Sequence, residues 1–145
     1  MISVKRFAAN YIACRSVDRL HYVEVTSGSV LNGVFPLEKE LAGTSFLNGV
    51  IWVVPAGLGW EVADVWSRLT AIHQQMPDAS VPEMLKELIG SEQLVAEQAA
   101  VPTLAMLTLP IPGEPVSLFL IRGIRLSAAE FGANNSGGNR YVERL

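Results

Sequence analysis

The stretch Asn48–Val62, NGVIWVVPAGLGWEV, determines the fold that the sequence predicts. Its run Val50–Val54 is apolar at consecutive positions, which is typical of a central strand that is buried on both faces. A turn at Pro55–Gly57 ends the strand. After Gly59 apolar residues recur every three or four positions, which predicts an amphipathic helix. This order indicates a domain that contains both strands and helices, and it specifies no chemistry.

Helices are expected near residues 61–76, 81–89 and 92–100. Pro77 ends the first apolar stripe, because proline cannot continue a helix. Ser80 and Glu83 have the spacing of a capping box, in which each side chain bonds the backbone N–H of the other residue. Gly90 is the expected end of the second helix, and Ser91 can cap the third.

Strands are expected on both sides of this helical block. Alternating, β-branched or continuous apolar residues predict them at His21–Thr26, Val30–Phe35, Thr103–Leu109 and Val116–Leu126. Ser27, Gly28 and Ser29 form a predicted turn between the first two strands. The Gly- and Asn-rich segment 132–139 has no periodicity, so we expect residues 132–145 to form a flexible arm that association needs and the fold does not.

These elements predict one α+β domain over residues 1–131, followed by the C-terminal arm 132–145. In this domain a mostly antiparallel or mixed sheet packs against two to three helices, because each helix has one apolar face that needs cover. The alternative is a β-sandwich or barrel that carries the helices as an insertion.

The composition favours a protein that binds other proteins. Of 145 residues, 50% are hydrophobic and 17% are charged, whereas about a quarter are charged in an ordinary domain. A small domain has little interior, so some apolar residues must reach its surface, where large apolar patches mark interfaces. We therefore expect partners that are other protein subunits, including copies of the same chain.

The charge distribution excludes some partner classes. Residues 23–100 carry three basic and ten acidic side chains, a balance of −7, which disfavours binding to phosphate backbones. We therefore do not expect the protein to bind nucleic acid. No apolar run is long enough for a transmembrane helix, and the N-terminus lacks the apolar core of a signal peptide. With Cys14 as the single cysteine, these features predict a cytoplasmic protein or a particle assembled in the cytoplasm.

The residues that could carry chemistry are few and scattered. Cys14, His21, Glu24 and His73 have no mutual spacing that is typical of a metal site or a nucleophile with its base. The two histidines are expected at the surface or the edge of the core, and Cys14 is expected to be buried. We therefore predict no catalytic residue, no metal site and no cofactor, although an enzyme remains a third possibility.

Gly49, Pro55 and Gly57 have the spacing of the second sequence motif of the cupin barrels, which this stretch partly resembles. The resemblance implies a barrel fold. In the motif a metal-binding histidine follows, and this chain has Trp60 there. The first cupin motif requires a His-x-His pair, and the chain offers His21 and Val23. The resemblance therefore implies no conventional metal site.

Together these features predict a structural or assembly subunit of a larger complex, such as a virion, a tail-like machine or a secretion apparatus. Aromatic and arginine residues concentrate at the energetic centres of interfaces. The residues proposed to contact partners are Trp52, Trp60, Arg140, Tyr141, Arg144 and Leu145. The alternative is a small-ligand-binding or regulatory domain in which the turn after Val54 lines the pocket.

Overall fold

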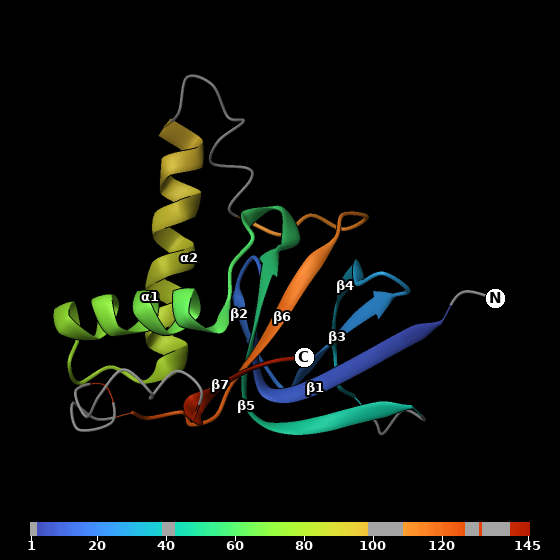
Figure 1. Cartoon of the computed structure of the whole chain (residues 1–145), viewed down its shortest axis with the longest axis horizontal. Helices are drawn as coiled ribbons and strands as arrows, with labels where there is room; N and C mark the ends of the chain where they lie inside the picture. The colour runs from blue at the N-terminus through green and yellow to red at the C-terminus, as the bar shows by residue number, and fades with distance from the viewer. Residues whose placement is uncertain (1–2, 39–42, 99–108, 127–130, 132–139) are drawn as a thin grey trace.

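The computed structural model describes residues 3–38, 43–98, 109–126, 131 and 140–145. It has a seven-stranded mixed sheet and two α-helices (Figure 1). This confirms the predicted α+β class and a single sheet packed against helices. The sheet is not closed into a barrel, so the barrel alternative, and with it the fold that the cupin-like spacing implied, is corrected.

The spatial order of the strands is β4-β3-β1-β5-β6-β7, with β2 beside the end of β1. Strands β1 and β5 are parallel, and all other pairs are antiparallel. The strands are β1 (Val4–Ala13), β2 (Val17–Arg19), β3 (His21–Thr26), β4 (Val30–Pro36), β5 (Thr44–Pro55), β6 (Val116–Ile121) and β7 (Val142–Arg144).

The helices follow β5 directly, as the opening stretch of sequence predicts. A short 3-10 turn, η1 (Ala56–Leu58), leads to α1 (Val62–Gln75), which ends before Pro77. The next helix, α2 (Val81–Gln98), begins at the predicted capping box: the Ser80 N–H donates to the Glu83 carboxylate, and the Glu83 N–H donates to Ser80 Oγ.

Helix α2 corrects the expected break at Gly90, because it runs through that residue without interruption. A Cβ added to Gly90 would meet no atom within 4 Å. A glycine inside a helix costs about 1 kcal/mol relative to alanine. That cost is small beside the burial of Met84, Leu85 and Ile89 on the same helix.

A sharp bend divides the sheet into two halves (Figure 1). Between Ala9 and Tyr11 the pairing of β1 with β5 shifts by one residue, which is a β-bulge. Asn10 Oδ1 accepts a hydrogen bond from the Gly49 N–H at 2.8 Å. Gly49 has φ +132°, and a Cβ there would overlap the Ile121 carbonyl oxygen, so the bend requires glycine.

We call the part before the bend the first half of the sheet and the part after it the second half. The first half contains β3, β4 and the segments Val4–Ala9 and Thr44–Leu47 of the two long strands. The second half contains β2, β6, β7 and the segments Tyr11–Ala13 and Val50–Pro55. Helices α1 and α2 contact β1, β2 and β7, so they cover the second half.

Two apolar clusters lie on opposite faces of the sheet. One lies between the second half and the helices, and its buried members include Trp52, Trp66, Leu69, Met84, Leu85, Phe119 and Ile121. The other fills the inner angle of the bend and joins both halves through Ala9, Ile12, Cys14, Val23, Val25, Leu31, Ile51, Val53, Val116, Leu118 and Leu120. The outer face of the first half contributes to neither cluster.

Two strand boundaries differ from the sequence prediction. Strand β5 begins at Thr44, because Gly49 forms a bulge and does not start the strand. Strand β6 ends at Ile121, where Arg122 leaves the ladder and its N–H donates to the Tyr141 carbonyl. The strand predicted at Thr103–Leu109 lies outside the described residues except for Leu109.

The expectation of a flexible arm is corrected for the last six residues. Val142–Arg144 pairs with β6 as β7, and Val142 is buried in the helix-facing cluster. The physical reason is that an unpaired edge of β6 would leave backbone donors and acceptors without partners. The rest of the predicted arm, 132–139, lies outside the described residues.

Candidate functional site

The tryptophans proposed as interface residues lie in one aromatic group between β5 and α1. Trp52 is buried at 4% exposure, and its ring packs edge-on against Trp60 with 5.4 Å between the centroids. Trp60 is partly exposed, and the Arg68 guanidinium lies 4.1 Å above its ring. Trp52 is therefore covered within the monomer, whereas part of Trp60 remains accessible.

The C-terminal candidates contact their own chain. Tyr141 stacks on Trp66 with 5.7 Å between the ring centroids, and the Arg140 guanidinium lies 5.6 Å from the Tyr141 ring. Arg144 Nη2 donates to Ser117 Oγ at 3.4 Å, while the Leu145 side chain is exposed. Most of the C-terminal residues that were predicted to contact a partner therefore pack against their own chain.

The four residues that could carry chemistry are not brought together. Cys14 is buried in the inner cluster, and burial raises the pKa of its thiol to about 11, which opposes formation of a nucleophilic thiolate. Glu24 forms an ion pair with Arg6 Nε at 2.9 Å, and His21 Nδ1 lies 2.9 Å from the Arg19 carbonyl oxygen.

His73 is buried at 6% exposure, which is deeper than the predicted surface or core-edge position. Its ring stacks on Phe131 with 4.4 Å between the centroids, and its Nδ1 has no hydrogen-bond partner within the described ranges. Helix α1 places it on the same apolar face as Leu69 and Ile72. Across the described part of the chain, no group of three His, Cys, Asp or Glu residues could hold a metal ion.

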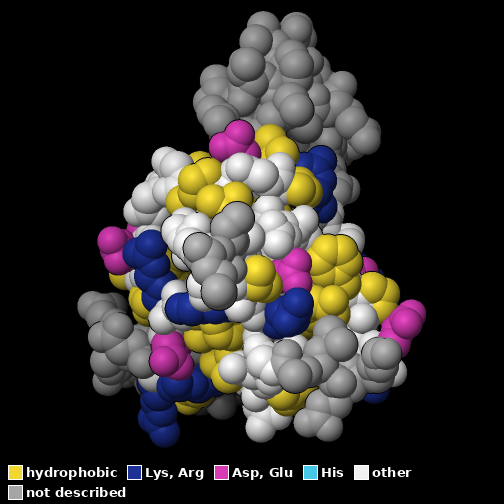
Figure 2. All heavy atoms as spheres, turned by 90° about the vertical axis from the view of Figure 1, so that its right-hand side faces the viewer, with side chains coloured by type: hydrophobic (Ala, Val, Ile, Leu, Met, Phe, Trp, Pro, Cys, Tyr) yellow, Lys and Arg dark blue, Asp and Glu magenta, His cyan; other side chains and the backbone are white. Residues whose placement is uncertain are grey.

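The outer face of the first half carries a row of aromatic side chains. The strand register aligns Phe35, Tyr22, Ala8 and Phe46 on β4, β3, β1 and β5. The Tyr22 and Phe35 rings lie 5.5 Å apart, and Phe46 is 51% exposed. Figure 2, which views the N-terminal side of the molecule, shows hydrophobic side chains reaching the surface between charged groups.

Beside this row lies a polar network that leaves the face electrically balanced. Glu24 accepts a hydrogen bond from Arg6 Nε and a second one from Asn32 Nδ2, each at 2.9 Å. Arg6 and Glu24 are cross-strand neighbours, which is the arrangement in which opposite charges stabilise a sheet. A partner on this face would therefore meet aromatic surface and an already paired charge.

Strand β5 has an open edge in the first half. Its residues Val50–Pro55 pair with β6, whereas Thr44–Leu47 pair with β1 alone within the part of the chain that the structure describes. In Figure 1 this segment forms the lower border of the sheet. The sequence did not predict this edge, because Thr44–Leu47 lacks the alternation of apolar and polar residues that is typical of a strand.

An apolar cleft of about 630 Å³ lies where β5 turns into η1. Pro55, Ala56, Gly57 and Leu58 form one wall, and the other wall comes from the segment around Leu109 and Ile111, including Glu114 and Pro115. The turn that the sequence proposed as a pocket lining therefore does border a cleft, which has the size of a small-molecule site.

Among the helices that the structure describes, none is long and apolar enough to cross a membrane. Comparisons of the chain with protein-family models, with curated proteins and with solved structures found no match.

Proposed function

We propose that the protein is a non-enzymatic assembly subunit that associates with a second copy of itself through the open edge of β5. The observation that carries this proposal is the pairing of Thr44–Leu47 on one side only, next to the half-exposed Phe46. An unpaired strand offers a row of backbone donors and acceptors to another strand.

The composition of this edge supports self-pairing. The segment Thr44–Asn48 contains no charged residue and no proline, which are the groups that natural edge strands use to prevent pairing. Two copies that pair antiparallel about a two-fold axis would place no like charges opposite each other. The row from Phe35 to Phe46 would then continue into the same row of the second copy, which buries Phe46 against apolar neighbours.

A low charged fraction and an apolar excess fit a subunit of a larger assembly, and a virion, tail-like machine or secretion apparatus belongs to this proposal as an example.

The test is the oligomeric state of Phe46→Lys, measured by sedimentation velocity over a wide concentration range. The wild type should form dimers or larger species, and Phe46→Lys should be monomeric because the lysine places like charges at the paired edge. Leu20→Lys is the matched control, because Leu20 is 48% exposed and lies in the turn between β2 and β3. It should associate as the wild type does.

Two outcomes would contradict self-association. One is a wild-type protein that stays monomeric at every concentration. The other is an equal loss of association in Phe46→Lys and Leu20→Lys, which would indicate a general charge effect. Circular dichroism of each variant must first establish that the fold is retained.

A second candidate, a small-ligand-binding domain, is favoured by the cleft at η1, whose wall is the turn Pro55–Leu58. Because that lining is mainly apolar, the ligand would be apolar as well. A thermal-shift screen of apolar small molecules tests it with the variant Gly57→Trp, which fills the cleft. A ligand that stabilises the wild type and fails to stabilise Gly57→Trp would support this role, and a screen without any such ligand would count against it.

A further inference from the structure

A second cleft, separate from the β5 edge and from the cleft at η1, lies at the start of α2. Its volume is about 430 Å³, and four parts of the chain form its walls. Strands β1 and β2 contribute Tyr11, Val17 and Arg19, α2 and its cap contribute Ser80, Pro82, Glu83 and Lys86, and the segment after β6 contributes Ile124 and Arg125.

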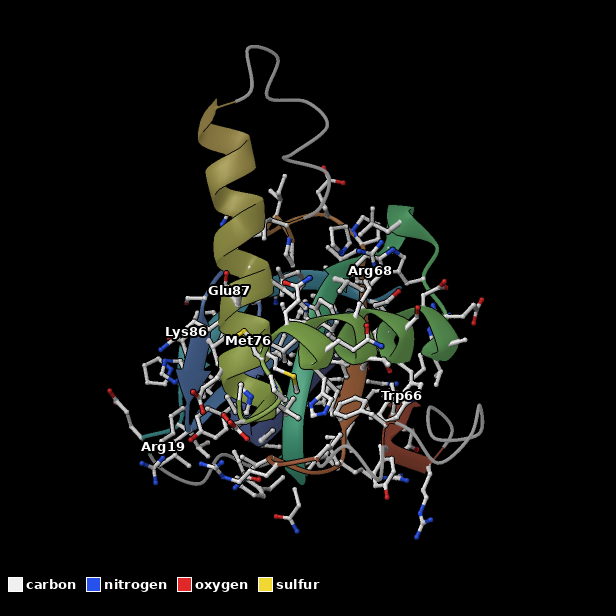
Figure 3. The ribbon with its side chains drawn as sticks, turned by 90° about the vertical axis from the view of Figure 1, so that its left-hand side faces the viewer. Arg19, Trp66, Arg68, Met76, Lys86 and Glu87 are labelled. Carbon is white, nitrogen blue, oxygen red and sulfur yellow. The ribbon has the colours of Figure 1, made fainter. Side chains whose placement is uncertain are left out.

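The cleft concentrates positive charge in a chain whose net charge is −3. Arg19, Lys86 and Arg125 come from three different elements, and Glu83 is the only acidic residue in the lining. The lining therefore has a formal balance of +2. Figure 3 shows Arg19 and Lys86 on the same side of α2.

Most other basic side chains of the described residues already have partners. Arg6 and Arg122 form ion pairs, Arg15 and Arg144 donate hydrogen bonds to protein oxygens, and Arg68 and Arg140 lie over aromatic rings. Within the described ranges, four basic side chains have no hydrogen bond, ion pair or ring contact: Lys5, Arg19, Lys86 and Arg125. Three of these four line the cleft.

The backbone at the start of α2 is already occupied and does not supply the binding groups. The Val81 N–H donates to the Ile124 carbonyl, the Glu83 N–H donates to Ser80 Oγ, and Pro82 has no N–H. The contact between Val81 and Ile124 also joins two walls of the cleft. Recognition must therefore come from the cationic side chains.

Glu83 offsets one of the three positive charges of the lining, which leaves a balance of +2. Its carboxylate accepts hydrogen bonds from the Ser80 N–H and hydroxyl. These bonds lower the pKa of Glu83, and the positive charges of Arg125 and Lys86 contribute to the same shift. The carboxylate is therefore engaged in the helix cap, which leaves the donors of Arg19, Lys86 and Arg125 available to another anion.

We propose that this cleft binds a small dianion of the phosphate class, either inorganic phosphate or a phosphate monoester. Two guanidinium groups can each donate two parallel hydrogen bonds to a tetrahedral oxyanion, and one ammonium group adds a compact positive charge. The volume suits a small ligand and is too small for a folded partner. This inference does not depend on self-association through β5.

Binding is measured by isothermal titration calorimetry with inorganic phosphate and with phenyl phosphate, each compared with chloride at equal ionic strength. Lys86→Gln and Arg125→Gln should each weaken binding about tenfold, the loss expected for one charge-assisted contact. Lys5→Gln and Arg144→Gln remove the same charges away from the cleft, and they should change the affinity less than about twofold. Tighter binding of phenyl phosphate would identify a monoester as the preferred source.

Three results would overturn the proposal. The first is that neither phosphate compound binds at matched ionic strength. The second is that cleft and control variants weaken binding equally, which would indicate nonspecific electrostatic attraction. In the third, a glutamate-rich peptide binds more tightly than both phosphates and loses affinity in Lys86→Gln, which would assign the cleft to an acidic polypeptide. Circular dichroism of Arg125→Gln separates a loss of binding from a loss of the fold.

Discussion

The two halves of the sheet are built on the same two long strands, yet their outer faces differ. In the second half this face is apolar and lies under α1 and α2, with Trp52 and Phe119 buried. In the first half it is uncovered and carries the Arg6–Glu24 ion pair beside exposed aromatic rings. One sheet therefore supplies both a core and a surface, because a bulge bends it between the two halves.

The inner faces of the two halves do not differ in this way. The bend brings both of them against one apolar cluster, in which Val23 and Val25 from the first half join Ile51 and Leu118 from the second. The backbone also links the halves: the Leu31 N–H donates to the Glu114 carbonyl at 3.0 Å, and the Gly113 N–H donates to the Leu31 carbonyl at 2.8 Å. The two halves therefore share one apolar cluster and are joined by backbone hydrogen bonds.

The largest effect is expected from removing the bend itself with Gly49→Ala. The new Cβ would overlap the Ile121 carbonyl oxygen at a positive φ that side chains rarely adopt. We expect a loss of about 3 kcal/mol or more in the free energy of unfolding, or failure to fold. Urea denaturation measures it. Gly57→Ala, which has open space around its Cβ, should change stability by less than about 0.5 kcal/mol, and equal effects would refute the role of the bend.

Deletion of residues 140–145 tests whether the second half needs its last strand. The truncation removes buried Val142, the Tyr141 ring that stacks on Trp66, and the pairing of β7 with β6. We expect stability to fall by about 3 kcal/mol or more, as for other large losses from a core, and the chain to aggregate through β6. Thermal unfolding and light scattering measure both effects.

The control for this deletion is Leu145→Ser, which changes an exposed residue and leaves β7 in place. It should melt close to the wild type. A truncated chain with unchanged stability would instead support the original expectation of a dispensable arm.

A smaller effect is expected from Asn10→Ala, which keeps the bulge and removes its side-chain bond. The Gly49 N–H would lose its 2.8 Å partner in a partly buried place. A buried donor without a partner costs about 1–3 kcal/mol. Asn32→Ala removes an exposed bond to Glu24 on the uncovered face and should cost less than about 1 kcal/mol. If Asn32→Ala is the more damaging variant, the bend does not depend on Asn10.

The smallest effect concerns Cys14 in the inner cluster that both halves share. Burial raises the pKa of its thiol from 9.0 to about 11, so the folded chain retains the proton at a pH where the unfolded chain has lost it. The contribution of the protonated Cys14 thiol to the free energy of unfolding is fully present below pH 9 and is lost as the pH rises toward 11. Between pH 8 and pH 10 this linkage should lower stability by about 1 kcal/mol.

Comparing the wild type with Cys14→Ala isolates this contribution, because lysine and tyrosine titrate in both proteins. The difference between their unfolding free energies, measured in urea at pH 8 and at pH 10, should change by that amount. A difference that does not vary with pH would mean that the thiol is accessible to water through an opening between the halves.

Local patterns in the sequence determined a large part of the structure. The α+β class, strands β3 and β4, helix α1 with its end before Pro77, the capping box at Ser80 and the burial of Cys14 agree with the prediction. Each depends on the periodicity of a short segment or on a side chain that bonds its own backbone, so the residues nearby contain the necessary information.

Tertiary structure alone decided the bend, the position of the C-terminal residues and the composition of the cleft at the start of α2. Gly49 indicates a bulge only once Asn10 and Ile121 lie beside it, and Tyr141 belongs to the core only because Trp66 offers a ring. Arg19, Lys86 and Arg125 meet because three elements converge. The physical reason is that contacts between residues distant in sequence depend on topology, which local propensity does not specify.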